Sequence, residues 1–259
     1  MPLPPLHVHD TGEGPALLFL HAFPLDASMW DHQVAALSSR FRCLRPDVWG
    51  FGSSPPSPAG VSLDDVAEGV VAALDSLRVG AATVVGLSMG GYTAFALLRR
   101  FADRVERLVL ADTRAGADTE AARTDRLRMA EQVRREGSVA AIVEPTVARL
   151  LAPESAAEYH VSDPVRGRIR RATTAGVAAM QEAMAARPDS TPLLGGIAVP
   201  ALVLVGSQDT VTPPEEAERM AAAIPGARLE VLDGAGHLSN LERWDRFNAV
   251  LGDFLEATA

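Results

Sequence analysis

Lysine is absent from this 259-residue chain, and only one cysteine is present. All 24 basic residues are therefore arginine, and 33 acidic residues outnumber them, for a formal net charge of −9. So acidic a surface argues against nucleic acid and anionic membranes as partners. The single Cys43 excludes an internal disulfide, and its apolar surroundings predict a buried, unreactive thiol. No apolar run approaches the roughly 18 residues of a membrane span.

Signatures of metal and cofactor sites are also missing. There is no His-Glu-x-x-His motif, and one cysteine cannot form a thiolate cluster, so we expect no metal. No Gly-x-Gly-x-x-Gly follows an early strand, and the segment 50–52 is too short to cradle a phosphate, so we expect no cofactor. Residues 1–9 lack the features of a signal peptide, which favours a cytoplasmic protein. The oligomeric state does not follow from the sequence.

Strands and helices alternate along most of the chain. A short opening strand is expected at 6–9, and apolar runs at 16–20, 43–48, 81–87, 105–111, 200–205 and 228–232 are typical of buried strands. Helical patterns follow at 29–37, 63–77, 92–100 and 244–255, and Thr212 begins a further helix as its expected cap. This order predicts an α/β fold with a mostly parallel sheet covered by helices on both faces.

The stretch between the helical pattern at 92–100 and the helix that begins at Thr212 differs. Residues 113–192 contain no convincing strand and read as helices at 119–136, 139–150 and 165–184. We expect a core domain formed by residues 1–112 and 193–259, with 113–192 inserted as a helical cap over a site. The alternative is an ordinary helical layer.

The most informative motif is Gly86-Leu87-Ser88-Met89-Gly90, between a Val-rich strand and a helix. Glycine on both sides of a serine permits a sharp, strained turn that exposes the hydroxyl. The helix that follows points free N–H groups and its positive end at that hydroxyl. We therefore expect Ser88 to be a catalytic nucleophile.

A serine nucleophile needs a base and a group that orients the base. His237 lies in a small-residue loop after the last strand, and Asp209 lies in the loop after the preceding strand. Both loops should meet Ser88 at the carboxyl edge of the sheet, and the order Ser, Asp, His is the one expected for such a turn. Asp112 also follows a strand at this edge and is the competing acid; otherwise it caps a helix or pairs with Arg114.

The other histidines have weaker cases as bases. His7 and His9 alternate on a short edge strand, His32 lies in a surface helix, and His160 lies in the expected cap. His21 precedes Ala22-Phe23-Pro24, a loop after the strand 16–20, and we expect it to hold that loop in place.

An oxyanion hole should complete the site. The loop 21–24 can present a backbone N–H to the nucleophile, and the residue after the nucleophile can present another. We expect the N–H groups of Phe23 and Met89 to form this hole. Pro24 has no N–H and restricts the loop's shape.

Four segments together resemble the α/β-hydrolase superfamily, namely 21–24, 47–54, 86–91 and 234–237. The resemblance implies an eight-stranded sheet whose second strand is antiparallel, with a cap after the sixth. Within the superfamily, the segments 86–91 and 235–242 are most similar to small carboxylesterases and 3-oxoadipate enol-lactonases. Ala22 departs from the usual glycine. Ser88 separates the chain from haloalkane dehalogenases and epoxide hydrolases, which use aspartate there.

The sequence thus predicts a serine carboxylesterase for small esters, with a small-molecule partner only. The candidate pocket walls, for each of which core packing is the alternative, are Phe23, Leu25, Trp30, Trp49, Met89 and Leu238. A lactonase of the enol-lactonase type is the nearest alternative, with perhydrolysis as a side activity and a non-catalytic ligand-binding protein as a remote one. A lactone carrying a carboxylate would need an arginine, and the candidates are Arg114, Arg149, Arg168, Arg170 and Arg171.

Overall fold

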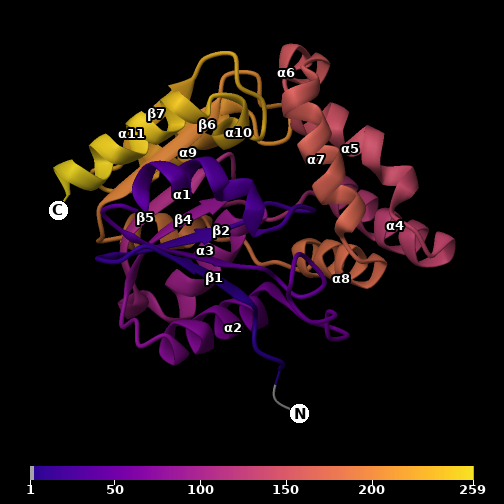
Figure 1. Ribbon diagram of the computed structural model, residues 1–259, viewed down its shortest axis with the longest axis horizontal. Coiled ribbons are helices and arrows are strands. Elements are labelled where there is room, and N and C mark those ends of the chain that lie inside the picture. Colours follow the sequence, from indigo (N-terminus) through magenta and orange to yellow (C-terminus); the bar gives the residue numbers. More distant parts are fainter. Residues whose placement is uncertain (1–2, 259) are drawn as a thin grey trace.

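A single twisted sheet forms the centre of the molecule (Figure 1). The computed structural model describes residues 3–258. Its strands are β1 (Val8–Thr11), β2 (Ala16–Leu20), β3 (Arg42–Pro46), β4 (Ala82–Leu87), β5 (Val105–Ala111), β6 (Ala201–Gly206) and β7 (Arg228–Leu232). They lie in the order β1-β3-β2-β4-β5-β6-β7, and only the pairing of β1 with β3 is antiparallel.

The resemblance implied eight strands, and this number is wrong: the described residues form seven. The antiparallel strand is therefore the first, and the helical segment follows the fifth strand rather than the sixth. Pro4 and Pro5 precede β1 and cannot donate to a sheet ladder, so this part of the chain is poorly suited to adding a strand. The backbone there bonds elsewhere, with the Pro4 carbonyl accepting from the indole of Trp49 at 2.9 Å.

Helices cover both faces of the sheet. They are α1 (Asp31–Leu37), α2 (Leu63–Ser76), α3 (Met89–Arg100), α4 (Glu120–Glu136), α5 (Val143–Leu150), α6 (Pro153–Ala157), α7 (Tyr159–Arg171), α8 (Thr174–Ala185), α9 (Pro214–Ala223), α10 (Ser239–Glu242) and α11 (Trp244–Ala257). The apolar residues of α2, α3 and α9 share one core cluster, and those of α1 and α11 share the other. Strands β2, β4 and β6 are buried along their whole length, as parallel strands between two helical layers must be.

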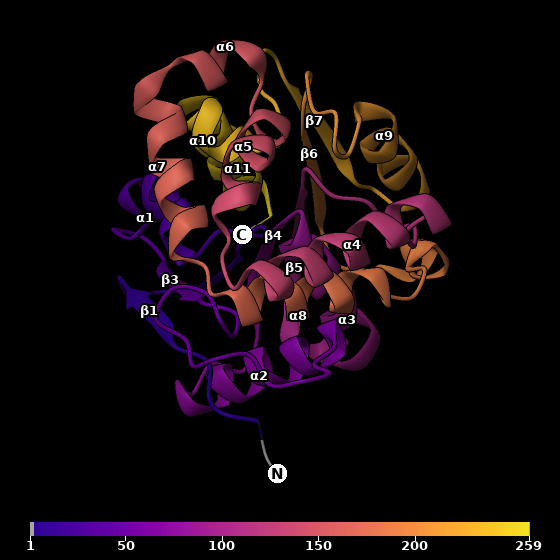
Figure 2. The same ribbon diagram turned by 90° about the vertical axis from the view of Figure 1, so that its right-hand side faces the viewer.

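The segment between β5 and β6 is helical, as expected. Helices α4–α8 lie to one side of the sheet in Figure 1 and in front of its strands in Figure 2. The helix predicted over 165–184 is in fact two helices. Ala172 leaves the helical conformation, and Thr173 caps α8 by accepting from the N–H of Gly176. A hydroxyl that satisfies a helix N-terminus favours such a break.

Helix α7 is fastened to the loop after β2. Arg171 pairs with the buried Asp26 at 2.8 Å, and Arg168 donates to the hydroxyl and carbonyl of Ser28, both at 2.9 Å. Gly176 of α8 approaches the backbone of Gly50 so closely that a Cβ on either would overlap the other. The helical segment therefore sits directly over the loops at the carboxyl edge of the sheet. Among residues 3–258, no helix is long and apolar enough to span a membrane.

Candidate active site

Ser88 occupies the sharp turn between β4 and α3. Its φ of 54° lies in the left-handed region, which costs a non-glycine residue free energy. The flanking glycines make the turn possible, because a Cβ on Gly86 would overlap the Gly90 carbonyl and one on Gly90 would overlap the Leu20 carbonyl. The hydroxyl is thereby held at the N-terminus of α3, as the motif predicts.

The structure brings Ser88, His237 and Asp209 into one hydrogen-bonded chain. Nε2 of His237 lies 2.8 Å from the Ser88 hydroxyl, and Nδ1 lies 2.8 Å from Oδ2 of Asp209. The His237 and Asp209 side chains are 1% and 0% exposed, so bulk water does not compete for these bonds. In the tautomer that donates from Nδ1 to the carboxylate, Nε2 is free to accept the serine proton.

Asp209 is held as an anion. Burial alone would raise the pKa of its carboxyl, but His237 and hydrogen bonds from Thr212 bring the pKa below its ordinary value. Oδ1 accepts from the N–H groups of Val211 and Thr212 at 2.8 and 3.0 Å, and Oδ2 accepts from the Thr212 hydroxyl at 2.7 Å. Thr212 is thus not the helix cap predicted for it, since Pro213 holds that position without a side-chain bond.

Sequence reasoning missed this role of Thr212. Its hydroxyl also lies 3.3 Å from Nδ1 of His237. The spacing Asp209-x-x-Thr212 was a usable signal, because an aspartate side chain commonly accepts from the N–H groups two and three residues later. The interpretation of Thr212 as a helix cap hid this role.

The two N–H groups expected to form the oxyanion hole have no hydrogen-bond acceptor in the described part of the chain. Within residues 3–258, neither Phe23 nor Met89 donates its N–H to a protein acceptor. Met89 is the first residue of α3, so its N–H has no partner inside the helix. Because Met89 directly follows Ser88, its free donor is suited to a negatively charged oxygen at the serine.

His21 does not reach the hydroxyl of Ser88. Its Nε2 accepts from the Val48 N–H at 3.0 Å, and its Nδ1 lies 3.0 Å from the Ala22 carbonyl. Burial lowers the pKa of the imidazole, so the ring is neutral and fits this donor and acceptor pair. The residue joins the loop 21–24 to the end of β3, which is the holding role predicted for it.

The remaining histidines lie away from this chain of bonds. His9 lies 3.1 Å from the buried Asp47, His32 stacks on Trp244, and the side chain of His160 is 81% exposed. His7 contacts the ring of His9 edge-on. Asp112, the competing acid, contacts Ser239 and not His237.

The six candidate pocket residues divide between the two core clusters. Trp30 is fully buried against Phe19 and Phe247, and Trp49 is fully buried against Gly69. Both tryptophans therefore pack as core residues in this conformation. Leu25 and Leu238 share the cluster of Trp30, whereas Phe23 and Met89 lie in the cluster of α2 and α3.

A basic cavity adjoins the loop that carries Asp209. Its walls include three arginines and one carboxylate, with the loop of Asp209 beside them: Arg114, Asp125, Arg126, Arg149, Thr210 and Val211. Arg114 and Arg126 share the buried Asp118, at 2.9 and 2.5 Å, whereas Arg149 forms no ion pair within the described part of the chain. Burial and the nearby charges of Arg126 and Arg114 lower the pKa of Arg149. Positive charge is therefore in excess here.

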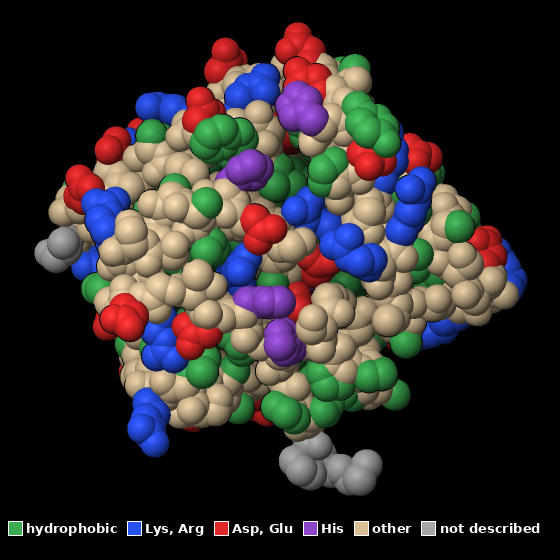
Figure 3. Space-filling model, in the orientation of Figure 1, with side chains coloured by type: hydrophobic (Ala, Val, Ile, Leu, Met, Phe, Trp, Pro, Cys, Tyr) green, Lys and Arg blue, Asp and Glu red, His purple; other side chains and the backbone are tan. Residues whose placement is uncertain are grey.

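A second hollow lies between α7 and the helices α1 and α10, on the face shown in Figure 3. His32, His160, Arg168 and Trp244 are among its walls, and side chains of both signs surround it. Arg168, Arg170 and Arg171 all lie on α7, and Arg171 pairs with Asp26. None of these three lines the basic cavity.

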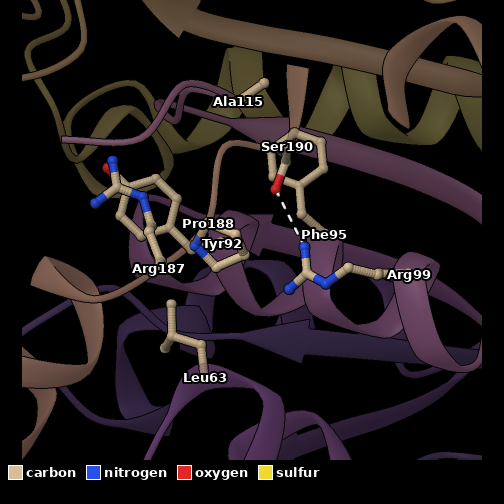
Figure 4. Close-up of a pocket in the computed structure, with 8 residues that line it drawn as sticks. All are labelled: Leu63, Tyr92, Phe95, Arg99, Ala115, Arg187, Pro188 and Ser190. Carbon is tan, nitrogen blue, oxygen red and sulfur yellow. Dashed lines mark hydrogen bonds between the residues drawn. The ribbon is translucent and has the colours of Figure 1, made fainter. Parts of the chain in front are cut away.

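Tyr92, on helix α3, packs against a buried arginine. Figure 4 shows the guanidinium of Arg187 against the ring of Tyr92, 4.0 Å from its centroid. Arg187 also pairs with Asp118 at 2.8 Å, and both side chains are almost fully buried. This contact connects the basic cavity to the helix that carries the nucleophile.

The sequence and the fold are similar to those of known proteins. Residues 15–243 match the sequence profile of the alpha/beta hydrolase fold. The chain belongs to the alpha/beta hydrolase family. It is 40% identical to a thermophilic esterase from Thermogutta terrifontis whose structure holds malate, with a TM-score of 0.94 over 98% of this chain and 93% of that one.

Two further relatives are named for lactone chemistry. The enol-lactonase of Burkholderia xenovorans is 35% identical, with a TM-score of 0.90 over 97% of this chain and 96% of that one. 3-Oxoadipate enol-lactonase 2 of Acinetobacter baylyi is 31% identical, over 90% of this chain and 86% of its own length. The resemblance stated from the sequence motifs is confirmed, and this alpha/beta hydrolase is a hydrolase by family.

Proposed function

We propose that this alpha/beta hydrolase cleaves small carboxylic esters through an acyl-enzyme. The observation that carries the proposal is His237, which bridges the Ser88 hydroxyl and the buried Asp209 carboxylate at 2.8 Å on each side. A neutral imidazole so placed can take the serine proton, and an anionic partner stabilises the imidazolium that results.

In the proposed reaction, the Ser88 oxygen attacks the ester carbonyl carbon while its proton passes to Nε2 of His237. The N–H groups of Phe23 and Met89 hold the oxyanion, at about 3–4 kcal/mol of transition-state stabilisation per donor. His237 then gives its proton to the leaving alcohol, and an acyl group remains on Ser88. Water, deprotonated by His237, attacks this acyl group and releases the acid.

We assign the helical segment 113–192 the role of a cap. The fastening of α7 to Asp26 and Ser28 supports this assignment, because those residues follow the loop that carries Phe23. A cap at this position would set the size of the acyl pocket and exclude water from the oxyanion.

A panel of p-nitrophenyl acetate, butyrate and octanoate tests the proposal, with Ser88→Ala as the matched control. We expect turnover that falls with chain length and disappears in Ser88→Ala. Undiminished turnover in that variant would contradict the mechanism.

The basic cavity favours a second candidate, hydrolysis of a lactone that bears a carboxylate. The chemistry at Ser88 is the same, but the leaving alcohol stays attached to the acyl group. Arg149 forms no ion pair among residues 3–258, and Asp125 on the same cavity wall pairs with Arg128 instead. An anionic group of the substrate would supply the missing charge.

Two comparisons test the second candidate. The first compares an enol-lactone with the p-nitrophenyl esters, and the second compares the same lactone with its carboxylate free or methylated. If the lactone is the better substrate, we expect Arg149→Ala to raise KM for the lactone with the free carboxylate only. Arg135→Ala, an exposed arginine on α4, should change neither. A lactone kcat/KM above that of every ester by tenfold, about 1.4 kcal/mol in transition-state binding, would favour the lactonase.

A further inference from the structure

The end of β5 contacts all three loops of the proposed catalytic chain. The Ala111 carbonyl accepts from the N–H of Ser88 at 3.0 Å, and the Thr113 hydroxyl donates to the Ser88 carbonyl at 2.9 Å. Between them lies Asp112, whose side chain is fully buried. This short segment therefore holds the backbone of the nucleophile from two sides.

Asp112 extends these contacts to the other two loops. Its Oδ1 accepts from the N–H of Gly206 at 2.9 Å, three residues before Asp209. Its Oδ2 lies 2.5 Å from the Ser239 hydroxyl, two residues after His237. One carboxyl group thus joins the loop of the acid to the loop of the base.

The backbone of Asp112 is held in an unfavourable conformation to make these contacts. Its φ of 44° lies in the left-handed region, which a non-glycine residue adopts at a cost. The N–H of Asp112 donates to the Leu204 carbonyl at 2.9 Å, which fixes the residue against β6. Glycine would relieve the strain but would remove both side-chain bonds.

We infer that Asp112 is a positioning residue, which sets the spacing of Asp209 and His237 through its bonds to Gly206 and Ser239. The inference rests on the proposed function, because it takes Asp209 and His237 to be the acid and the base of that reaction. It assigns Asp112 no contact with the substrate. It differs from the alternatives weighed for the sequence, in which Asp112 was a rival acid, a helix cap or a partner of Arg114.

The surroundings of the Asp112 carboxyl favour its neutral form. Burial and the charge of Asp209 raise the pKa of Asp112 well above its ordinary value, with Glu242 adding to the effect. A second anion beside Asp209 would be unfavourable, whereas a neutral carboxyl can accept both from the Gly206 N–H and from the Ser239 hydroxyl. Asparagine can accept from Gly206 through Oδ1 and donate through Nδ2 to the Ser239 oxygen, so Asp112→Asn should preserve both contacts.

The test compares Asp112→Asn, Asp112→Ala and Ser239→Ala with the wild type. We expect Asp112→Ala to lower kcat roughly tenfold or more at nearly unchanged KM, because small displacements of reacting groups are costly. Asp112→Asn should retain kcat, and Ser239→Ala, which removes one of the two bonds, should fall between. Circular dichroism and Tm establish that each variant is folded.

The loss of kcat at nearly unchanged KM, and its rescue in Asp112→Asn, separate positioning from a merely structural role, and the pH profile of kcat/KM tests the charge of Asp112. An anion near His237 favours the protonated base, so removing a charged Asp112 would shift the acid limb to lower pH. A neutral Asp112 predicts that Asp112→Asn leaves this limb in place. Thr83→Ala, a buried threonine in β4 on no loop of the site, controls for general loss of stability.

Wild-type kcat in Asp112→Ala or in Ser239→Ala would overturn the inference, and so would a loss in Asp112→Asn equal to that in Asp112→Ala. If Asp112→Ala does not fold, Ser239→Ala and Asp112→Asn decide. The rate of Ser88 labelling by a fluorophosphonate separates this inference from the proposed function. An unlabelled wild type contradicts the function, whereas equal labelling of wild type and Asp112→Ala contradicts the inference alone.

Discussion

At the scale of single residues, the site depends on how one carboxylate is kept charged in a buried place. Asp209 accepts two backbone N–H groups, a hydroxyl and an imidazole, which compensate for its lost hydration. Thr212 supplies two of these four bonds. The threonine is therefore as much a part of the arrangement as the motif residues.

Thr212→Val should lower kcat about tenfold, since a hydrogen bond to a charged group contributes roughly 1.5–3 kcal/mol. The substitution removes the hydroxyl but keeps the backbone N–H bond to Asp209. Steady-state kinetics on a p-nitrophenyl ester measures the effect. Thr83→Val is the matched control, and a Thr212→Val enzyme with the control's kcat would contradict this role.

At the scale of elements, the strand-turn-helix unit of β4 and α3 tolerates no added atom at its turn. A Cβ on Gly90 would overlap the backbone of β2, which cannot shift without disturbing the sheet. The residue type at this position is thus set by packing between elements and not by the chemistry of the site.

Gly90→Ala should lower the free energy of unfolding by about 3 kcal/mol or more, because overpacking against backbone has no easy relief. Gly252→Ala on α11 is the control, since a Cβ there meets no neighbour within 4 Å. Alanine in a helix should raise stability by about 0.5–1 kcal/mol. Urea unfolding of both variants tests the contrast, and equal midpoints would refute it.

Asp118 joins several elements around the basic cavity. It pairs with Arg114 before α4, Arg126 on α4 and Arg187 after α8. Burial works against its charge, but Arg126 and Arg187 hold the pKa of Asp118 below the ordinary value of 3.8. A lowered pKa in the folded state means that these pairs stabilise the fold above pH 3.8 and lose that effect as pH falls through the folded value.

Asp118→Asn should therefore lower the free energy of unfolding at pH 7 by about 3–5 kcal/mol, because it leaves buried arginines without their partner. The difference from wild type should shrink as pH falls below 3.8. Denaturant unfolding between pH 3 and 7 measures this dependence. A difference that stays constant over the range would show that the charge of Asp118 is not responsible.

At the scale of the whole molecule, the sequence predicted the layers and the loops that meet at the site. Strand-helix alternation and the motifs around Ser88 and His237 are local signals, and they sufficed for this. The seven strands inferred from the residues are confirmed in number, whereas the eighth strand that the resemblance implied is absent from the described part of the chain at the sheet edge, where Pro4 and Pro5 precede β1. The break at Thr173 was missed because the helical pattern continues on both sides of it.

Contacts between distant segments that carry no motif could not be predicted from the sequence. The bond of Asp112 to Ser239 spans 127 positions, and no local pattern predicts such a distance in space. The same holds for the basic cavity, where helices from the insertion bring Arg149 near the loop of Asp209. A chain with net charge −9 thus concentrates positive charge beside its proposed reaction centre.

The central claim is that Ser88 is the nucleophile, and peptide mapping after reaction with a p-nitrophenyl phosphonate tests it most directly. The phosphonate leaves a stable adduct on an activated serine. The account predicts one adduct per chain, located on Ser88, with loss of ester hydrolysis in proportion to labelling and no adduct in Ser88→Ala. Ester hydrolysis that persists in a fully labelled protein, or an adduct on another residue, would contradict it.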